Sequence, residues 1–198
     1  MNPMLLNEML EKAFARLGEG YCEDAIETFS EYLLRAPNEV EAYRGRALAY
    51  FQIKNWDAAI ENFKRARELG SDDPENWIGL GTSLALANQI YEGIDVFEAL
   101  LAKHPHYVRG HIQLGALYYH LGTITKGHRQ MDLALASRPS SEERRLIEKL
   151  RKEQILLDKK RYYRPDFEAL RKQNKSLASD SWAKKIADFL NRGFRRSS

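Results

Sequence analysis

All five histidines of the chain fall in one stretch, from His104 to His128, and this clustering raises the question of metal binding. Imidazole nitrogen is a common zinc ligand, but zinc sites draw on ligand pairs at short, characteristic spacings. His111 and His120 are nine residues apart, which places them about half a rotation apart on one helix. The spacing therefore predicts no metal site, and we expect the protein to need no cofactor.

Residues for catalysis are equally scarce. The sequence has no glycine-rich phosphate loop, no nucleophile elbow and no His-Glu-x-x-His motif. Cys22 is the only cysteine, so it has no partner for an intramolecular disulfide. We expect Cys22 to be a small packed thiol and the protein not to be an enzyme.

The charged residues are distributed unevenly along the chain. Residues 1–141 contain 14 Lys and Arg against 19 Asp and Glu, whereas residues 142–198 contain 17 against 9, which gives net charges of −5 and +8. Such an asymmetry indicates an electrostatic partner, or one end of the chain attracting the other. The basic end could also attract the phosphates of a nucleic acid or a membrane surface.

A repeat of 34 residues organises most of the chain. The large apolar residues that mark it are Phe29, Phe63, Phe97 and Met131, and Ile26, Ile60 and Ile94 recur at the same interval. Four consecutive units follow, at residues 6–39, 40–73, 74–107 and 108–141. A repeat of this length is typical of stacked helical pairs that bury a continuous core together.

Each unit has the apolar pattern of two helices. In the third unit, Trp77, Leu80 and Leu84 fall on one helical face, and the next helix presents Ile90, Ile94, Phe97 and Leu101. Gly81 and Gly115 lie inside helices, where glycine costs roughly 1 kcal/mol relative to alanine. We therefore predict an all-α solenoid in which neighbouring helices approach closely at these two glycines.

The pattern of Trp77, Leu80, Gly81, Phe97 and Pro105 resembles the tetratricopeptide-repeat (TPR) signature. The resemblance implies four repeats, a protein-interaction scaffold, and a concave groove lined by the first helix of each unit, where a partner peptide or helix binds. The groove positions it implies are Leu10, Phe14, Arg44, Leu48, Phe51, Ile78, Thr82, Arg109, Ile112, Ala116 and Tyr119. Some of these positions would instead pack between first helices.

One TPR subclass holds a peptide's C-terminal carboxylate in a clamp of Lys, Asn and Arg. The positions implied by this resemblance hold Asn7, Leu10, Phe14, Glu41, Arg44, Glu75 and Gly79, which is not the clamp set. We therefore expect no carboxylate recognition of that kind, and expect Arg44 to be solvated or paired with a glutamate.

The C-terminal third begins with a capping box, in which Ser140 is the N-cap and Glu143 lies three residues on. It predicts a capping helix over 142–164 whose narrow apolar stripe is formed by Leu146, Ile147, Leu150 and Leu157.

The remaining residues, 165–198, form a basic amphipathic segment. Its apolar side chains share one helical face and are Trp182, Ile186, Phe189 and Leu190. They could contact the repeats of this chain, as an autoinhibitory segment, or those of a second copy, as a dimer contact; opposite charges favour these two. A partner protein is the third destination. A peripheral association with a membrane surface or nucleic acid is the alternative function.

The compartment is predicted from absences. No apolar run approaches the roughly 18 residues of a membrane-spanning helix. The residues before Glu8 carry no positive region of the kind that opens a secretory signal. Together with the lone cysteine, these features predict a cytoplasmic protein.

Overall fold

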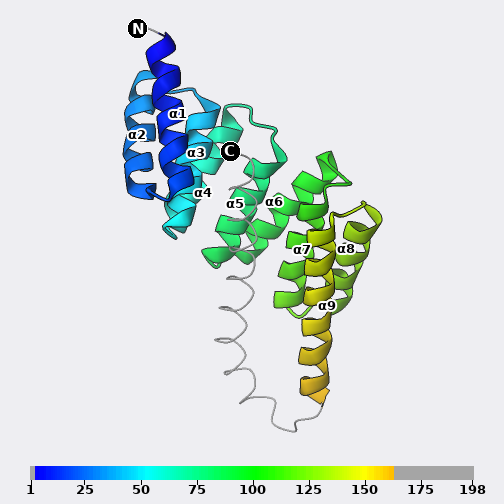
Figure 1. Cartoon of the computed structure of the whole chain (residues 1–198). Helices are drawn as coiled ribbons and strands as arrows, with labels where there is room; N and C mark the ends of the chain where they lie inside the picture. The colour runs from blue at the N-terminus through cyan, green and yellow to red at the C-terminus, as the bar shows by residue number, and fades with distance from the viewer. Residues whose placement is uncertain (1–2, 163–198) are drawn as a thin grey trace. The chain divides into compact units, whose positions relative to one another are not determined.

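The computed structural model describes residues 3–162, and every regular element in that range is an α-helix, as predicted (Figure 1). The helices are α1 (Pro3–Glu19), α2 (Cys22–Arg35), α3 (Val40–Gln52), α4 (Trp56–Glu68), α5 (Pro74–Leu86), α6 (Ile90–Lys103), α7 (Val108–His120), α8 (Ile124–Ala136) and α9 (Ser141–Tyr162). Within the described residues no helix has the length and apolar character needed to cross a bilayer.

The helix boundaries follow the period of the sequence. Helices α2, α4, α6 and α8 begin at residues 22, 56, 90 and 124, each 34 after the last. Helices α3, α5 and α7 begin at residues 40, 74 and 108, again at intervals of 34. The spacing that the apolar residues show along the sequence is therefore also the spacing of the helices.

The turn inside each helical pair repeats as well. Its left-handed residues are Gly20, Lys54, Asn88 and Gly122, with φ of 90°, 62°, 66° and 74°. The residue after each one donates a backbone hydrogen bond five residues back, for example from Asn55 to Tyr50 at 2.9 Å and from Gln89 to Leu84 at 2.8 Å. This bond satisfies a carbonyl that the helix end would otherwise leave unpaired. The same backbone geometry therefore closes the first helix of all four pairs.

The chain divides into two compact units, and the first of them ends at Val96. Within it, α1 packs on α2, α2 on α3, α3 on α4 and α4 on α5, while the first helices α1, α3 and α5 also contact one another in order. The rings of Phe29 and Phe63 are fully buried. They lie against Gly45 and Gly79, where a Cβ atom would overlap the ring. Glycine at these two positions lets neighbouring helices approach closely.

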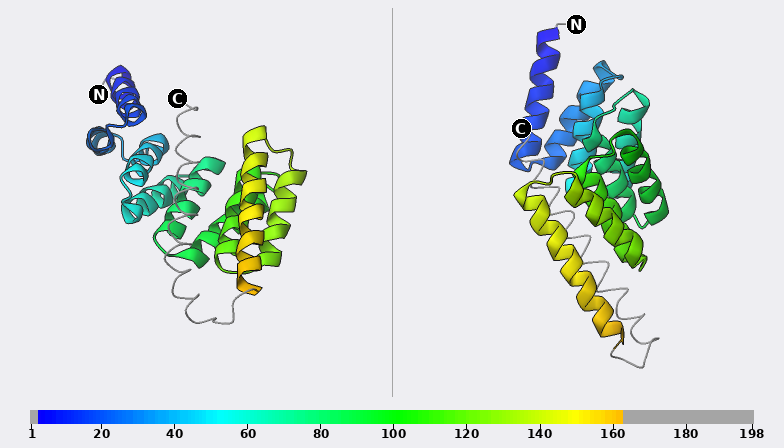
Figure 2. Two further views of the ribbon diagram at one scale, coloured as in Figure 1. Left: turned by 60° about the horizontal axis from the view of Figure 1, so that its bottom comes forward. Right: turned by 90° about the vertical axis from the view of Figure 1, so that its right-hand side faces the viewer.

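The second unit begins at Phe97 and contains α7, α8 and α9, which lie side by side (Figure 2). Met131 is fully buried, and its Cε would lie 2.9 Å from a Cβ added at Gly115. This confirms the predicted close contact at Gly115. Gly81 is buried too. The Arg151 guanidinium attaches α9 to α8 through the Asp132 carboxylate and the His128 carbonyl.

The predicted core side chains are buried. Those tested are Phe63, Trp77, Leu80, Phe97 and Tyr118, none of which is more than 8% exposed.

The capping box at the start of α9 is also confirmed. The Ser140 N–H donates to Glu143 Oε2 at 2.8 Å, and the Glu143 N–H donates to Ser140 Oγ at 3.3 Å. The predicted apolar stripe of α9 is wrong at one residue. Leu157 is 41% exposed, and Gln154 is buried instead. Ile147 and Leu150 are buried on the same side as Gln154, so α9 packs as far as Gln154, and directly after it Ile155, Leu156 and Leu157 are exposed to solvent.

Candidate functional site

The predicted groove positions differ in how accessible they are. Seven are buried, namely Leu48, Phe51, Ile78, Thr82, Ile112, Ala116 and Tyr119. The other four are half-buried, namely Leu10, Phe14, Arg44 and Arg109. Because a fully buried side chain cannot touch a partner, the accessible part of the predicted surface in this structure consists of the half-buried residues.

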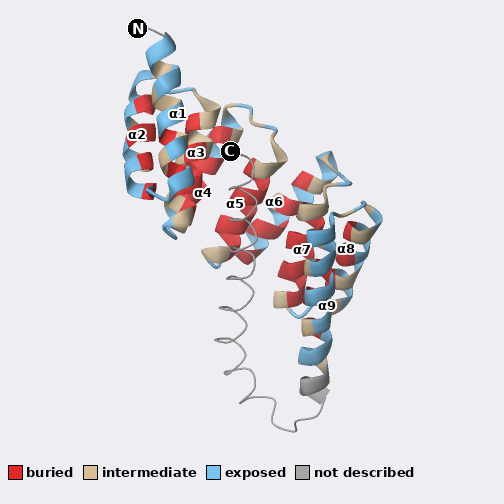
Figure 3. Ribbon diagram, in the orientation of Figure 1, coloured by how far each residue is buried: buried red, intermediate tan, exposed pale blue. Residues whose placement is uncertain are grey.

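Five of the seven buried positions belong to α5 and α7, whose central turns are covered on every side. All residues from 76 to 85 in α5 and from 110 to 119 in α7 are buried (Figure 3). Ten residues make nearly three helical turns, so no face of either helix is left open. A signal in the sequence could have shown this, because residues 76–91 and 110–125 contain no Asp, Glu, Lys or Arg. A helix without a charged face is generally buried all round.

The half-buried residues of the first unit form a cluster on α1 and α3. Leu10 and Phe14 are one turn apart on α1, so they share a face of that helix. The Phe14 ring meets the Phe29 ring edge to face, with centroids 5.1 Å apart. Phe14 also lies against Gly45 of α3, with its Cε1 3.0 Å from the position of a Cβ there. Phe14 therefore borders the residue that follows Arg44 in the sequence, and Leu10 lies one turn away from Phe14 on the same face of α1.

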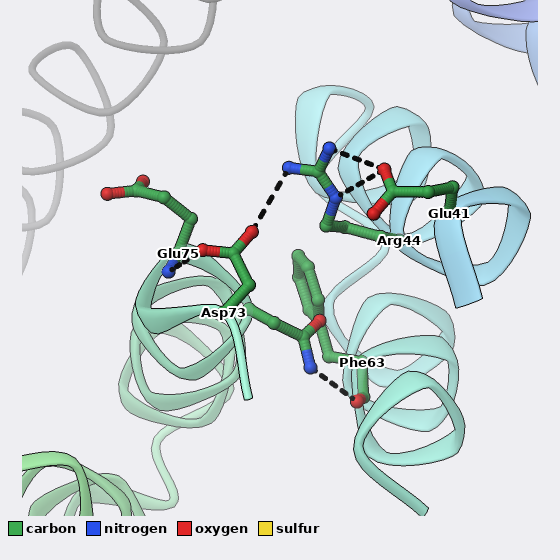
Figure 4. A network of polar contacts seen from close by, with 6 residues as sticks. Glu41, Arg44, Phe63, Asp73 and Glu75 are labelled. Carbon is green, nitrogen blue, oxygen red and sulfur yellow. Dashed lines mark hydrogen bonds and ion pairs between the residues drawn. The ribbon is translucent and has the colours of Figure 1, made fainter. Parts of the chain in front are cut away.

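Arg44 is bound by two carboxylates (Figure 4). Its Nη2 and Nε donate to Glu41 Oε2 at 2.6 and 3.1 Å, and its Nη1 lies 3.6 Å from Asp73 Oδ2. The other carboxylate oxygen of Asp73 accepts from the Glu75 N–H at 3.0 Å and caps α5. The predicted pairing of Arg44 with a glutamate is confirmed. Its charge is already compensated, and the group of Arg44, Glu41, Asp73 and Glu75 is net negative.

Two of the five histidines, His111 and His128, have side-chain hydrogen-bond partners that explain their positions. His111 is buried, and its Nε2 lies 2.8 Å from the Pro105 carbonyl, which can only accept, so Nε2 carries the hydrogen. Its Nδ1 lies 2.8 Å from Gln130 Oε1, and His128 Nδ1 lies 2.8 Å from the Tyr119 hydroxyl. Over residues 3–162, no group of three or more His, Cys, Asp and Glu side chains is placed to hold a metal ion.

The thiol of Cys22 is packed, as predicted. It is 6% exposed, and its Sγ donates to Gln52 Oε1 at 3.2 Å. Burial and the nearby Glu23 charge raise the pKa of the Cys22 thiol, which lowers its thiolate fraction and hence its reactivity.

The predicted tail contact lies outside the described residues. It comprises Trp182, Ile186, Phe189 and Leu190 in the segment 165–198. Its docking on a repeat array, and its alternatives at a membrane surface or on nucleic acid, stay predictions.

Comparison with known protein families and sequences finds a matching family model and two relatives of partial similarity. Residues 10–74 match the family model of the tetratricopeptide repeat. A peroxisomal targeting signal receptor of Candida albicans is 28% identical over 88 residues, and tetratricopeptide repeat protein 13 of Homo sapiens is 29% identical over 123 residues. These alignments include 44% and 60% of this chain, and they span only 15% and 13% of the relatives' own lengths.

Comparison with solved structures extends the likeness in fold. A crystal structure of MamA protein aligns with a TM-score of 0.63 at 22% identity, covering 67% of this chain and 72% of that one. MamA from Desulfovibrio magneticus RS-1 aligns with a TM-score of 0.64 at 16% identity, covering 95% of this chain and 96% of that one. At such identities the likeness shows the fold alone. Residues 10–74 therefore contain tetratricopeptide-repeat sequence, and the chain shares the all-α solenoid fold of these solved structures.

Proposed function

We propose that this protein is a binding module, rather than an enzyme, and that it holds a segment of a partner protein on the first-helix face of α1 and α3. The observation that carries the proposal is the half-buried pair Leu10 and Phe14 on α1, of which Phe14 lies against Gly45, the residue after the charge-compensated Arg44. These residues lie in the part of the predicted groove that remains accessible. The repeat fold supports this role, since stacked helical pairs create extended binding surfaces.

The chemistry of this face defines the kind of partner. Leu10 and Phe14 offer apolar area, and covering it stabilises a complex by about 25 cal/mol per Å². The carboxylates of Glu41 and Asp73 outnumber the single guanidinium of Arg44, and Glu11 is exposed on α1. A segment with an apolar or aromatic side chain beside Lys or Arg fits this face. A segment ending in a free carboxylate does not, because Arg44 is already occupied.

The comparisons support a binding role in general terms. One relative is by name a receptor for a targeting signal. Its alignment with this chain is short, so the partner proposed here rests on the residues of α1 and α3 and not on that name.

Selection of peptides on the full chain tests the proposal. Short random peptides displayed on phage are selected on the full-length protein, and the enriched sequences are synthesised and titrated. We expect an aromatic or aliphatic residue close to Lys or Arg in those sequences. Leu10→Glu should weaken their binding about tenfold or more, which corresponds to at least about 1.4 kcal/mol.

Leu133→Glu is the matched control. Leu133 is 41% exposed on α8 and does not belong to the proposed face, so binding should be unchanged. Circular dichroism of both variants checks that the helices are intact. Enrichment of acidic peptides, or equal loss of binding in both variants, would contradict the proposal.

A further inference from the structure

In a longer repeat array, another helix would pack against the outer face of α9. The residues of α7 that precede it by 34 positions are His111, Leu114, Gly115 and Tyr118. Three of these residues contact α8: His111 contacts Gln130, Gly115 lies against Met131, and the Tyr118 ring lies under the Lys126 ammonium group. In α9 the equivalent positions hold Arg145, Glu148, Lys149 and Lys152. This stripe corresponds to the face that packs on a second helix, but it is lined by charges.

The stripe borders a shallow hollow that is open to solvent. Its lining residues are Arg145, Glu148, Lys149, Lys152, Glu153 and Leu156. Arg145, Lys149 and Lys152 are exposed and make no ion pair within the part of the chain that the structure describes. Leu156 is 58% exposed. Even with its two glutamates the hollow is net positive.

A complementary stripe lies on the exposed face of α2. Glu23, Glu27 and Glu31 follow one another at intervals of four residues, and Leu34 comes three residues later. All four are exposed, and Leu34 at 86% is the most exposed large apolar side chain of the described residues. Both α2 and α9 show continuous exposed faces (Figure 3).

The two stripes match in order and length. On α2 three carboxylates are followed by a leucine 11 residues after the first of them, and on α9 three cations are followed by Leu156, also 11 residues after the first. At 1.5 Å per residue both stripes are about 16 Å long. Two such helices laid parallel bring opposite charges together along their length and place the two leucines at the same end.

We propose that the outer stripe of α9 in one copy of this protein binds the outer stripe of α2 in a second copy. Glu23, Glu27 and Glu31 then face Arg145, Lys149 and Lys152, and Leu34 covers Leu156. The two surfaces are different, so each copy offers one stripe of each kind, and successive copies associate into a closed ring or an open array. Association therefore increases with concentration.

At the α9 stripe, charge complementarity favours the second copy over the chain's own C-terminal segment. Residues 163–198 contain nine Lys and Arg against four Asp and Glu, so they share the sign of the three cations on α9. Exposed ion pairs contribute only about 0–1 kcal/mol each, and salt screens them over a Debye length of about 10 Å at 0.1 M and 3 Å at 1 M. The contact is therefore weak and sensitive to salt.

Sedimentation velocity of the full-length protein tests this proposal through charge reversal. At low salt we expect the sedimentation coefficient to rise with concentration, and this rise should disappear near 1 M salt. Glu27→Lys alone and Lys149→Glu alone should each weaken association about tenfold or more. The double variant, or an equimolar mixture of the two single variants, should associate again, because each restores an opposite-charge pair. Lys64→Glu, at an exposed position on α4, is the control and should change nothing.

Two results would overturn the proposal. One is a sedimentation coefficient that does not depend on concentration at low salt. The other is association that survives both single reversals and is lost with Phe189→Ser and Leu190→Ser. None of the reversed residues belongs to the face of Leu10, Phe14 and Arg44, so either result leaves the proposed peptide binding untouched.

Discussion

Gly79 marks a contact where a single methyl group matters. A Cβ at this position in α5 would overlap the ring of Phe63, which is fully buried, so the ring would have to shift within the core. We expect Gly79→Ala to lower the free energy of unfolding by about 1–3 kcal/mol, as overpacking of a core does. Gly18, near the end of α1, has no atom within 4 Å of its Cβ position, so Gly18→Ala should raise that free energy by up to about 1 kcal/mol. Urea unfolding measures the free energy of unfolding of both variants. A change of equal size and sign in the two variants would contradict this account.

Ionisation of Tyr118 makes the free energy of unfolding depend on pH in the alkaline range. Burial, and then the hydrogen bond that its hydroxyl donates to Glu98 at 2.7 Å, raises the pKa of Tyr118 from 10.0 to about 12. The unfolded phenol therefore ionises at a pH where the folded one is still protonated. Stability is fully present below pH 10 and falls as the pH rises from 10 towards 12. Burial raises the pKa of Tyr119 to about 12 as well, so both residues contribute to this loss.

The variant Tyr118→Phe distinguishes the contribution of Tyr118 to this loss of stability from that of Tyr119. We expect it to cost about 0.5–1.5 kcal/mol at neutral pH, because it removes the hydrogen bond to the exposed Glu98, and to reduce the further loss of stability above pH 10. Urea unfolding from neutral pH to about pH 11 measures both effects. An unchanged slope above pH 10 would show that Tyr118 does not titrate in this way.

At the scale of the helices, the turn inside each pair depends on a left-handed residue. Gly20 and Gly122 adopt it without steric cost, whereas Lys54 has a φ of 62° with a side chain attached. A non-glycine residue in this region costs roughly 1–2 kcal/mol. We expect Lys54→Gly to raise the free energy of unfolding by about 1 kcal/mol after the entropy cost of glycine. Lys64→Gly, inside α4, should lower it by a similar amount, and thermal melts of the pair test the difference.

At the scale of the whole molecule, each helix contacts mainly its neighbours in the sequence. Phe29 is buried among α1, α2 and α3, and its removal by Phe29→Ala should cost about 3–5 kcal/mol locally. In a repeat array such a loss spreads only through neighbouring contacts. We expect faster amide exchange in α1, α2 and α3 with little change in α8 and α9. Met131→Ala is the reciprocal variant, and uniform acceleration along the chain in either case would show a single cooperative unit.

Most of the helical order was predictable because the same contact recurs at a constant interval. Phe29, Phe63 and Phe97 are buried at equivalent places, and the helix starts keep their spacing of 34 residues. Gly45 and Gly79 were missed as close contacts, although they too are 34 apart and lie against those phenylalanines. Leu157 was misplaced because an apolar stripe indicates which face can be buried but not how far along α9 a neighbour extends.

The sequence by itself determined the helices, their turns and the residues that pair within the core. These depend on contacts between residues a few turns apart, and the same contacts recur in each repeat. Only the tertiary structure decided which first-helix residues remain accessible, because exposure depends on what covers each helix from all sides. Ile78 and Leu10 hold similar positions in their repeats, yet Ile78 is fully buried and Leu10 is half-buried. It also decided the charge state of the face around Arg44, since Asp73, 29 residues away, reaches the guanidinium only when α3 and α5 lie side by side.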